Sequence, residues 1–73
     1  MRTVKVSRNV WGNYGCFTGA TRTDSFGDRY DATGWLSGQI EAGARLSQKS
    51  EITLADVNAH RARLGQHPIE SQK

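Results

Sequence analysis

Cysteine and long apolar segments are both scarce in this sequence. Its 73 residues include a single cysteine, Cys16. One cysteine can form neither a disulfide within the chain nor a zinc site built from several cysteines, so a reducing compartment is expected. No segment is apolar over the length that a signal peptide or a bilayer-spanning helix requires. We therefore expect a cytoplasmic protein with no membrane partner.

Motifs for catalysis, metal binding and phosphate binding are also lacking. His60 and His67 lie seven residues apart with Pro68 after the second, a poor arrangement for one helical face, and no nearby cysteine or carboxylate pair completes a metal site. Gly12 and Gly15 are not followed by the start of a helix, as a phosphate-binding glycine loop requires. We predict no enzymatic activity, hence no catalytic residues, no metal and no cofactor.

Positively charged residues are only slightly more numerous than negatively charged ones. Ten lysines and arginines against seven aspartates and glutamates give a formal net charge of +3. Such a balance draws a small domain toward polyanions, although dedicated nucleic-acid binders carry more clustered positive charge. The composition therefore favours nucleic acid as a partner without excluding a protein.

Length and composition indicate one folded domain. A chain of 73 residues is near the lower limit at which a single hydrophobic core holds without a metal or a disulfide. Hydrophobic residues make up 36% and charged residues 23% of the chain, which is too apolar for a disordered protein. We predict one domain over residues 1–65 and a loosely ordered tail over residues 66–73, with Ile69 as its anchor.

Residue patterns in the first third of the chain predict β-strands. Residues 3–7 alternate polar and apolar side chains, which places Val4 and Val6 on one face. Residues 21–26 contain the β-branched and polar residues typical of a strand with one side in water. Between these segments, residues 10–18 combine strand-forming side chains with interrupting glycines.

Two interpretations of residues 10–18 compete. In the first, Gly12 and Asn13 form a tight turn between two short strands. In the second, the segment is one bent strand whose glycines mark a bulge or a close approach. We favour the bent strand. Alternation would then place Trp11 and Phe17 under the helix that follows, and Tyr14 on the opposite face.

The central stretch of the chain predicts an amphipathic helix over about residues 28–45. Its apolar positions recur at spacings of three and four and would form one stripe, with Trp35 facing the strands. That stripe contains Ala32, Trp35, Leu36, Ile40, Gly43 and Leu46. A helix with so large an apolar face needs a partner surface, which only the strands before it can supply.

Local signals suggest how this helix begins and ends. Asp28 or Ser25 can cap its first free amides. Gly34, Gly38 and Gly43 each weaken a helix by roughly 1 kcal/mol relative to alanine. Either these glycines allow a close approach to the sheet, or the helix breaks near Gly43.

A second helix is predicted over about residues 54–64. Thr53 and Asp56 have the spacing of a capping box, while Gly65 and Pro68 end the helix. The fold class is therefore α+β, with about three antiparallel strands in residues 3–26, one helix packed across them, and this second helix.

The order of these elements resembles two families of DNA-binding domains. Three strands, the corner Phe26-Gly27-Asp28, and a helix with Ala32 and Trp35 toward the sheet are similar to the arm-binding domain of tyrosine recombinases and to the plant ethylene-response domain. The resemblance covers residues 4–46. It implies a sheet laid in the major groove, with basic and aromatic side chains meeting bases and phosphates.

Carried onto this chain, that resemblance implies a set of candidate contact residues on the strands. They are Lys5, Arg8, Trp11, Tyr14 and Arg22. We take Lys5, Arg8, Tyr14 and Arg22 as the candidate binding residues. The segment 13–17 also resembles the aromatic-glycine-aromatic strands of cold-shock and RNA-recognition domains, whose aromatic side chains stack on bases.

Two functions from different classes follow. The first is a small accessory protein of a phage or mobile element that binds DNA or RNA through the open face of its sheet. The alternative is a protein-binding module, such as a phage-encoded inhibitor of a host defence (anti-CRISPR-like) or of another regulatory complex. A homodimer is also expected, formed through the strand at residues 21–26 or through the apolar stripe of the second helix.

Overall fold

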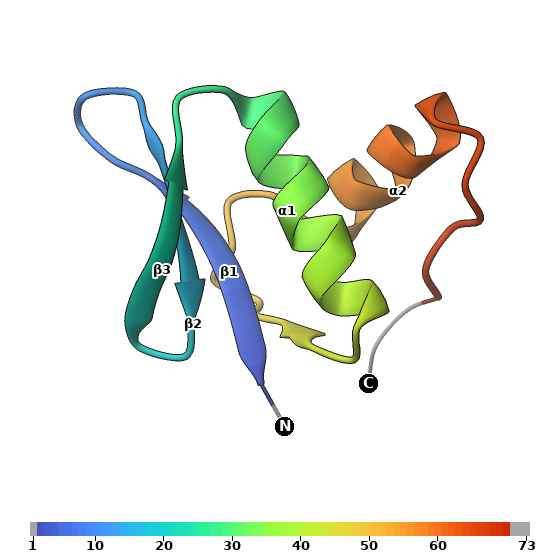
Figure 1. Ribbon diagram of the computed structural model, residues 1–73, viewed down its shortest axis with the longest axis horizontal. Coiled ribbons are helices and arrows are strands. Elements are labelled where there is room, and N and C mark those ends of the chain that lie inside the picture. The colour runs from blue at the N-terminus through green and yellow to red at the C-terminus, as the bar shows by residue number, and fades with distance from the viewer. Residues whose placement is uncertain (1, 71–73) are drawn as a thin grey trace.

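The computed structural model describes residues 2–70, which form a four-stranded mixed sheet with two helices on one side (Figure 1). In chain order the elements are β1 (Thr3–Arg8), β2 (Tyr14–Thr18), β3 (Thr21–Phe26), α1 (Arg29–Glu41), β4 (Arg45–Leu46) and α2 (Leu54–Arg63). The strand order across the sheet is β3-β2-β1-β4. The predicted α+β class, with three antiparallel strands and two helices, is confirmed.

The core lies between the sheet and α1. Val4 and Val6 of β1 are fully buried, as their alternation predicts, and Val6 pairs with Cys16 of β2 on the same face. Helix α1 covers this face, and α2 packs on the far side of α1 (Figure 1). The remaining buried apolar residues are Ala32, Leu36, Ile40, Ala44, Ile52 and Val57.

The connection between β1 and β2 is a loop over residues 9–13, so the favoured single strand from residue 10 is wrong. The Asn9 side-chain oxygen accepts hydrogen bonds from the backbone amides of Trp11 and Asn13, both at 3.0 Å. The Asn9 amide donates to the Asn13 carbonyl at 2.9 Å, and Gly12 has a φ of +83°. Because Asn9 takes up the amides that a strand would need, β2 begins only at Tyr14.

Helix α1 is shorter than predicted at its C-terminus. It ends at Glu41, and Gly43 follows with a φ of +104°, a conformation suited to glycine. The expectation of a break near Gly43 is therefore confirmed. Asp28 occupies the N-cap position, but its side chain makes no capping hydrogen bond. Gly34 approaches His60 of α2 and not the sheet, since a Cβ there would lie 3.7 Å from His60 Nε2.

The buried face of α1 is more polar than the predicted stripe. It consists of Ala32, Thr33, Leu36, Ser37 and Ile40. Trp35 is half-buried and packs against the core from the flank of the helix. The predicted contact of Trp35 with the core is thus confirmed, although Ala32 and Leu36 supply the fully buried surface.

Residues 45–51 run along the free edge of β1. Strand β4 pairs with β1 in parallel, and beyond it the amides of Ser47 and Glu51 donate to the carbonyls of Val4 and Val6 at 2.9 and 2.8 Å. The Ser50 hydroxyl accepts from the Val6 amide at 3.0 Å. These bonds satisfy backbone groups that a free sheet edge would leave exposed.

Helix α2 matches its predicted bounds to within one residue. Thr53 Oγ1 accepts from the Asp56 amide at 3.3 Å, and Asp56 Oδ2 accepts from the Thr53 amide at 3.0 Å, which completes the capping box. Beyond the helix, the side-chain amide of Asn58 makes two hydrogen bonds with the backbone of Ile69, at 2.9 and 2.7 Å. Residues 71–73 of the expected tail lie outside the described residues.

Candidate functional site

The sheet has one uncovered face, opposite the helices (Figure 1). Directly paired residues share a face, so the register assigns side chains to it. Lys5 pairs with Phe17, and Phe17 with Arg22, while Val4 and Val6 point the other way into the core. We call Lys5, Phe17 and Arg22 the open-face cluster.

The side chains of Lys5 and Arg22 both lie near the Phe17 ring. Lys5 Nζ lies 5.2 Å from the centroid of the Phe17 ring, within the range of a cation–π interaction. A Cβ at Gly15 would lie 3.2 Å from Phe17 Cε1 and 3.3 Å from Arg22 Cδ. Glycine at this position therefore lets the ring and the Arg22 side chain lie side by side against the strand.

Charge on this face is of one sign. By its pairing with Thr3, Arg45 of β4 adds a further cation to the side of the sheet that carries Lys5. The strands contain one acidic residue, Asp24, and its pairing with Cys16 places it on the core side. The pKa of the Cys16 thiol is raised to about 11, mainly because the thiol is buried and to a smaller extent because the Asp24 carboxylate is nearby. The open face therefore holds cations with no strand carboxylate among them.

Two of the four predicted binding residues lie outside the open-face cluster. Tyr14 is half-buried and packs against the core, so its expected place on the open face is wrong. Arg8 pairs with Tyr14 at the loop end of β1. Phe17 occupies the open face in place of Tyr14, because Cys16 is the β2 residue that fills the core between β1 and α1.

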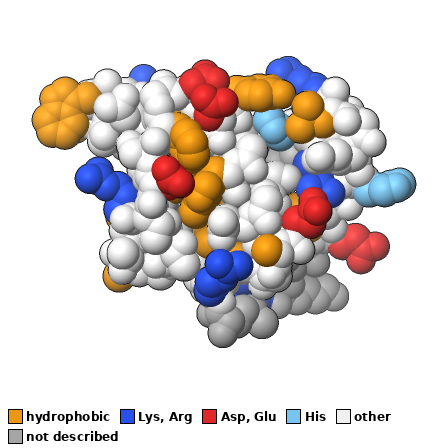
Figure 2. Space-filling view, viewed as in Figure 1, with side chains coloured by type: hydrophobic (Ala, Val, Ile, Leu, Met, Phe, Trp, Pro, Cys, Tyr) orange, Lys and Arg blue, Asp and Glu red, His pale blue; other side chains and the backbone are white. Residues whose placement is uncertain are grey.

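The loop over residues 9–13 carries two exposed apolar side chains, so the expected burial of Trp11 is also wrong. Val10 is 90% and Trp11 82% exposed. In Figure 1 this loop bends away from the helices, at the upper left. Figure 2 shows hydrophobic side chains projecting there, with a basic side chain below them on the same side. Bonds from Asn9 hold the loop, so this exposure belongs to an ordered conformation.

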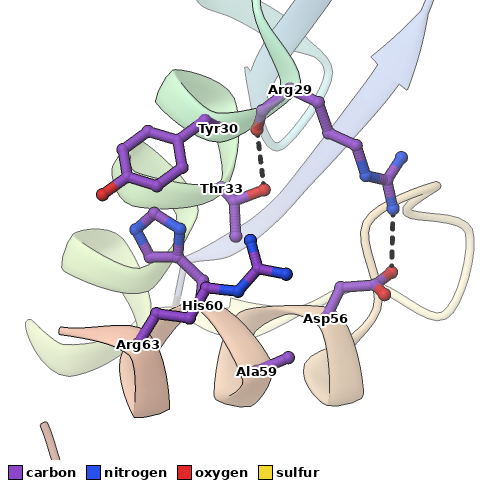
Figure 3. A pocket seen from close by; sticks show the side chains of 7 residues that line it. All are labelled: Arg29, Tyr30, Thr33, Asp56, Ala59, His60 and Arg63. Atoms are coloured by element: carbon purple, nitrogen blue, oxygen red, sulfur yellow. Dashed lines mark hydrogen bonds and ion pairs between the residues drawn. The ribbon is translucent and has the colours of Figure 1, made fainter. Parts of the chain in front are cut away.

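A recess of about 230 Å³ lies between α1 and α2, away from the sheet (Figure 3). It is lined by Arg29, Tyr30, Thr33, Asp56, Ala59, His60 and Arg63. His60 is only 7% exposed, and its ring centroid lies 4.5 Å from that of Tyr30 with the planes tilted by 58°. Sequence reasoning missed this recess, because its walls come from two helices whose packing no local pattern reveals.

Asp56 links the rim of the recess to the start of α2. Its Oδ2 atom lies 3.0 Å from Arg29 Nη2, and the same oxygen accepts from the Thr53 amide. The hydrogen bond from the Thr53 amide, with smaller contributions from the Thr53 hydroxyl and Arg29, lowers the pKa of the Asp56 carboxyl. Asp56 is therefore an ionised acceptor whose Oδ2 atom is shared by the Thr53 amide, the Thr53 hydroxyl and Arg29.

Wider comparisons give no precedent for either surface. Within residues 2–70, no three His, Cys, Asp or Glu side chains are grouped so that they could hold a metal ion. Neither helix of that part of the chain has the length and apolar content needed to cross a membrane. Comparisons with protein-family models, with curated proteins and with solved structures find no match to this chain.

Proposed function

We propose that this protein binds nucleic acid through the open face of its sheet, as a small accessory protein without catalytic activity, of the kind encoded by phages and mobile elements. The observation that carries the proposal is the open-face cluster, in which Lys5 and Arg22 flank the Phe17 ring. Asp24 points to the other side of the sheet. Cations around an aromatic ring suit a polyanion that also offers flat bases.

Each member of the cluster has a distinct role in this proposal. Lys5 and Arg22, with Arg45 beside them, contact phosphates and supply binding energy that depends on salt. Phe17 presents part of its ring as a surface on which a base stacks. Gly15 keeps this surface flat, because any larger residue would displace the ring and the Arg22 side chain.

The test is a salt titration with defined substitutions. Labelled single-stranded DNA, duplex DNA and single-stranded RNA are titrated with protein, and fluorescence anisotropy is recorded at several salt concentrations. We expect the logarithm of the association constant to fall linearly with the logarithm of salt concentration. Lys5→Gln and Arg22→Gln should each reduce that slope by about 1. Phe17→Ala should weaken binding by about 1–3 kcal/mol per stacked base with little change in slope.

A matched control removes one charge elsewhere. Lys49→Gln takes away a cation from the exposed turn after β4 and should leave the slope within error of the wild type. Absence of binding to all three nucleic acids at low salt contradicts the proposal. An effect of Lys49→Gln as large as that of Lys5→Gln also contradicts it, because binding would then follow net charge alone.

A second function is favoured by the exposed loop. Val10 and Trp11 are an apolar pair held out from the surface, and tryptophan is enriched among residues that dominate protein interfaces. We propose as the alternative that this loop inserts into a host protein complex, such as a defence complex that the protein inhibits. A stoichiometric partner should then be recovered from nuclease-treated host lysate by the wild type and lost with Trp11→Ala. Recovery of no partner argues against this function.

Self-association is a further proposal about the same sheet. Strand β3 is an edge of the sheet and is exposed along most of its length. An exposed edge can pair with its copy, which would add surface burial to a small core. Sedimentation at two concentrations tests this proposal, and a monomer at both contradicts it.

A further inference from the structure

The recess between α1 and α2 brings together basic groups that are far apart in the sequence. Arg29 is the first residue of α1 and Arg63 the last of α2. Figure 3 shows both guanidinium groups at the recess, with the His60 and Tyr30 rings forming its other wall. Two cations face one carboxylate, Asp56, so the recess has a positive balance before any charge on His60 is counted.

Arg63 has unused hydrogen-bonding capacity in this recess. Among residues 2–70, its guanidinium takes part in no hydrogen bond or ion pair. In Figure 3 it reaches inward beneath the His60 ring toward the side of Asp56. A guanidinium carries five N–H donors, and here all of them remain for a ligand.

Among residues 2–70, Asp56 forms its ion pair with Arg29 and none with Arg63. Its Oδ2 atom already accepts from the Thr53 amide, the Thr53 hydroxyl and Arg29, at 3.0, 3.1 and 3.0 Å. Arg29 donates to Asp56 from one terminal nitrogen, and its other N–H donors remain available. The recess thus offers two forked donors from different helices with free N–H groups, and one carboxylate whose Oδ2 atom is already engaged.

We propose that this recess binds a phosphoryl group, as inorganic phosphate or as a phosphate monoester, with Arg63 and the free donors of Arg29 as its ligands. Forked donors approaching from two directions match a tetrahedral anion with several acceptor oxygens, whereas a single carboxylate is satisfied by one guanidinium. The volume of about 230 Å³ also leaves room for a small group attached to the phosphate, beside the Tyr30 ring.

This site is independent of the proposed nucleic-acid surface. Helix α1 separates the recess from the sheet, and α2 lies on the outer side of α1 (Figure 1). A phosphate bound in the recess would not touch the open-face cluster. Failure of one proposal therefore leaves the other standing.

The test follows the protein by NMR during titrations with inorganic phosphate, 5′-AMP and a phosphoserine peptide, each against sodium chloride at equal ionic strength. We expect saturable shifts of the Tyr30, His60 and Arg63 resonances. Tighter binding of 5′-AMP than of phosphate identifies a nucleotide ligand, and tighter binding of the peptide identifies a phosphorylated protein. Equal binding of all three identifies the phosphoryl group alone as the recognised element.

Substitutions at exposed positions complete the test. Arg63→Gln should weaken phosphate binding about tenfold, as expected for the loss of one charge-assisted contact. Arg63→Lys, which keeps the charge but loses the fork, should fall between Arg63→Gln and the wild type. Lys49→Gln serves as the charge-matched control and should change nothing. Shifts that fail to saturate, that sodium chloride reproduces, or that Lys49→Gln weakens equally overturn the proposal.

Discussion

The guanidinium of Arg61 on α2 forms a 2.8 Å ion pair with the carboxylate of Glu41 on α1. The pair is asymmetric, because the Arg61 side chain is 9% exposed and that of Glu41 is 66% exposed. Arg61 also donates to the Ser37 hydroxyl at 3.0 Å and to the His67 carbonyl at 2.6 Å. One buried side chain therefore joins the two helices to the segment that follows them.

This asymmetry predicts unequal costs for removing the two partners. Arg61→Met should lower the free energy of unfolding by about 2 kcal/mol, because the buried Ser37 hydroxyl and the part-buried His67 carbonyl lose their donor. Glu41→Gln should cost less than about 1 kcal/mol, since its carboxylate is largely in water. Urea denaturation of both variants measures the difference. Equal losses would show that the exposed ion pair, and not the buried hydrogen bonds, holds the helices together.

Much of the fold was predictable where the signal is local. The alternation around Val4 and Val6 identified β1, and Thr53 with Asp56 marked the start of α2. Such patterns depend on residues close in sequence, so they can be recognised without knowledge of the tertiary structure. The pairing of β4 with β1 was not predictable in this way. It joins segments about forty residues apart through backbone groups, and a two-residue strand has no side-chain signature.

Removing the capping carboxylate should destabilise the protein in a pH-dependent manner. Asp56→Ala should cost about 1 kcal/mol near neutral pH, through loss of the reciprocal cap of α2. Because the folded state lowers the pKa of Asp56, its ionisation contributes stability above the ordinary carboxyl pKa of about 4, and that stability is lost as pH falls through the lowered value. The gap between wild type and Asp56→Ala should therefore narrow in acid, as measured by thermal unfolding across pH.

The control for Asp56→Ala is the removal of an aspartate from the first turn of α1. Asp31→Ala removes a carboxylate from the first turn of α1 without touching a capping box. Its effect should be smaller, because only the interaction with the helix dipole is lost. A gap for Asp56→Ala that widens at low pH contradicts the assignment of the cap to the ionised carboxylate.

The two tryptophans should differ sharply in their effect on stability. Trp11→Ala should change the free energy of unfolding by less than about 0.5 kcal/mol, because the side chain is largely in water and contacts little. Trp35→Ala should cost about 2 kcal/mol or more, because that ring packs against the core. Urea denaturation checks both values. A large loss for Trp11→Ala would mean that the loop is packed against the domain, and would remove the basis for its proposed role in partner binding.

The candidate site was predictable only in part. Lys5 and Arg22, which the resemblance to DNA-binding domains implied as contact residues, both lie on the open face, where polar residues of a half-buried strand are expected. The sequence does not predict that Phe17, and not Tyr14, lies on the open face, because both residues are aromatic and either could pack in the core. The burial of Cys16 identifies the core face of β2. A small cysteine in an alternating strand is the sequence signal that could have indicated this face.

The buried thiol of Cys16 should resist alkylation in the folded protein. It is fully buried, and its pKa of about 11 leaves little thiolate at neutral pH. Since the ordinary thiol pKa is lower, the unfolded chain ionises first as pH rises, so stability should fall in the alkaline range between the two values. Native protein should therefore react with iodoacetamide about a hundredfold more slowly than protein unfolded in urea, as followed by mass spectrometry.

Asp24→Asn, which removes the nearby negative charge, should speed the native reaction slightly, whereas Asp28→Asn, which makes the same change at the corner before α1, should not. Rapid modification of the native protein would show that β2 opens frequently, and that the core between Cys16 and Val6 is not closed in solution.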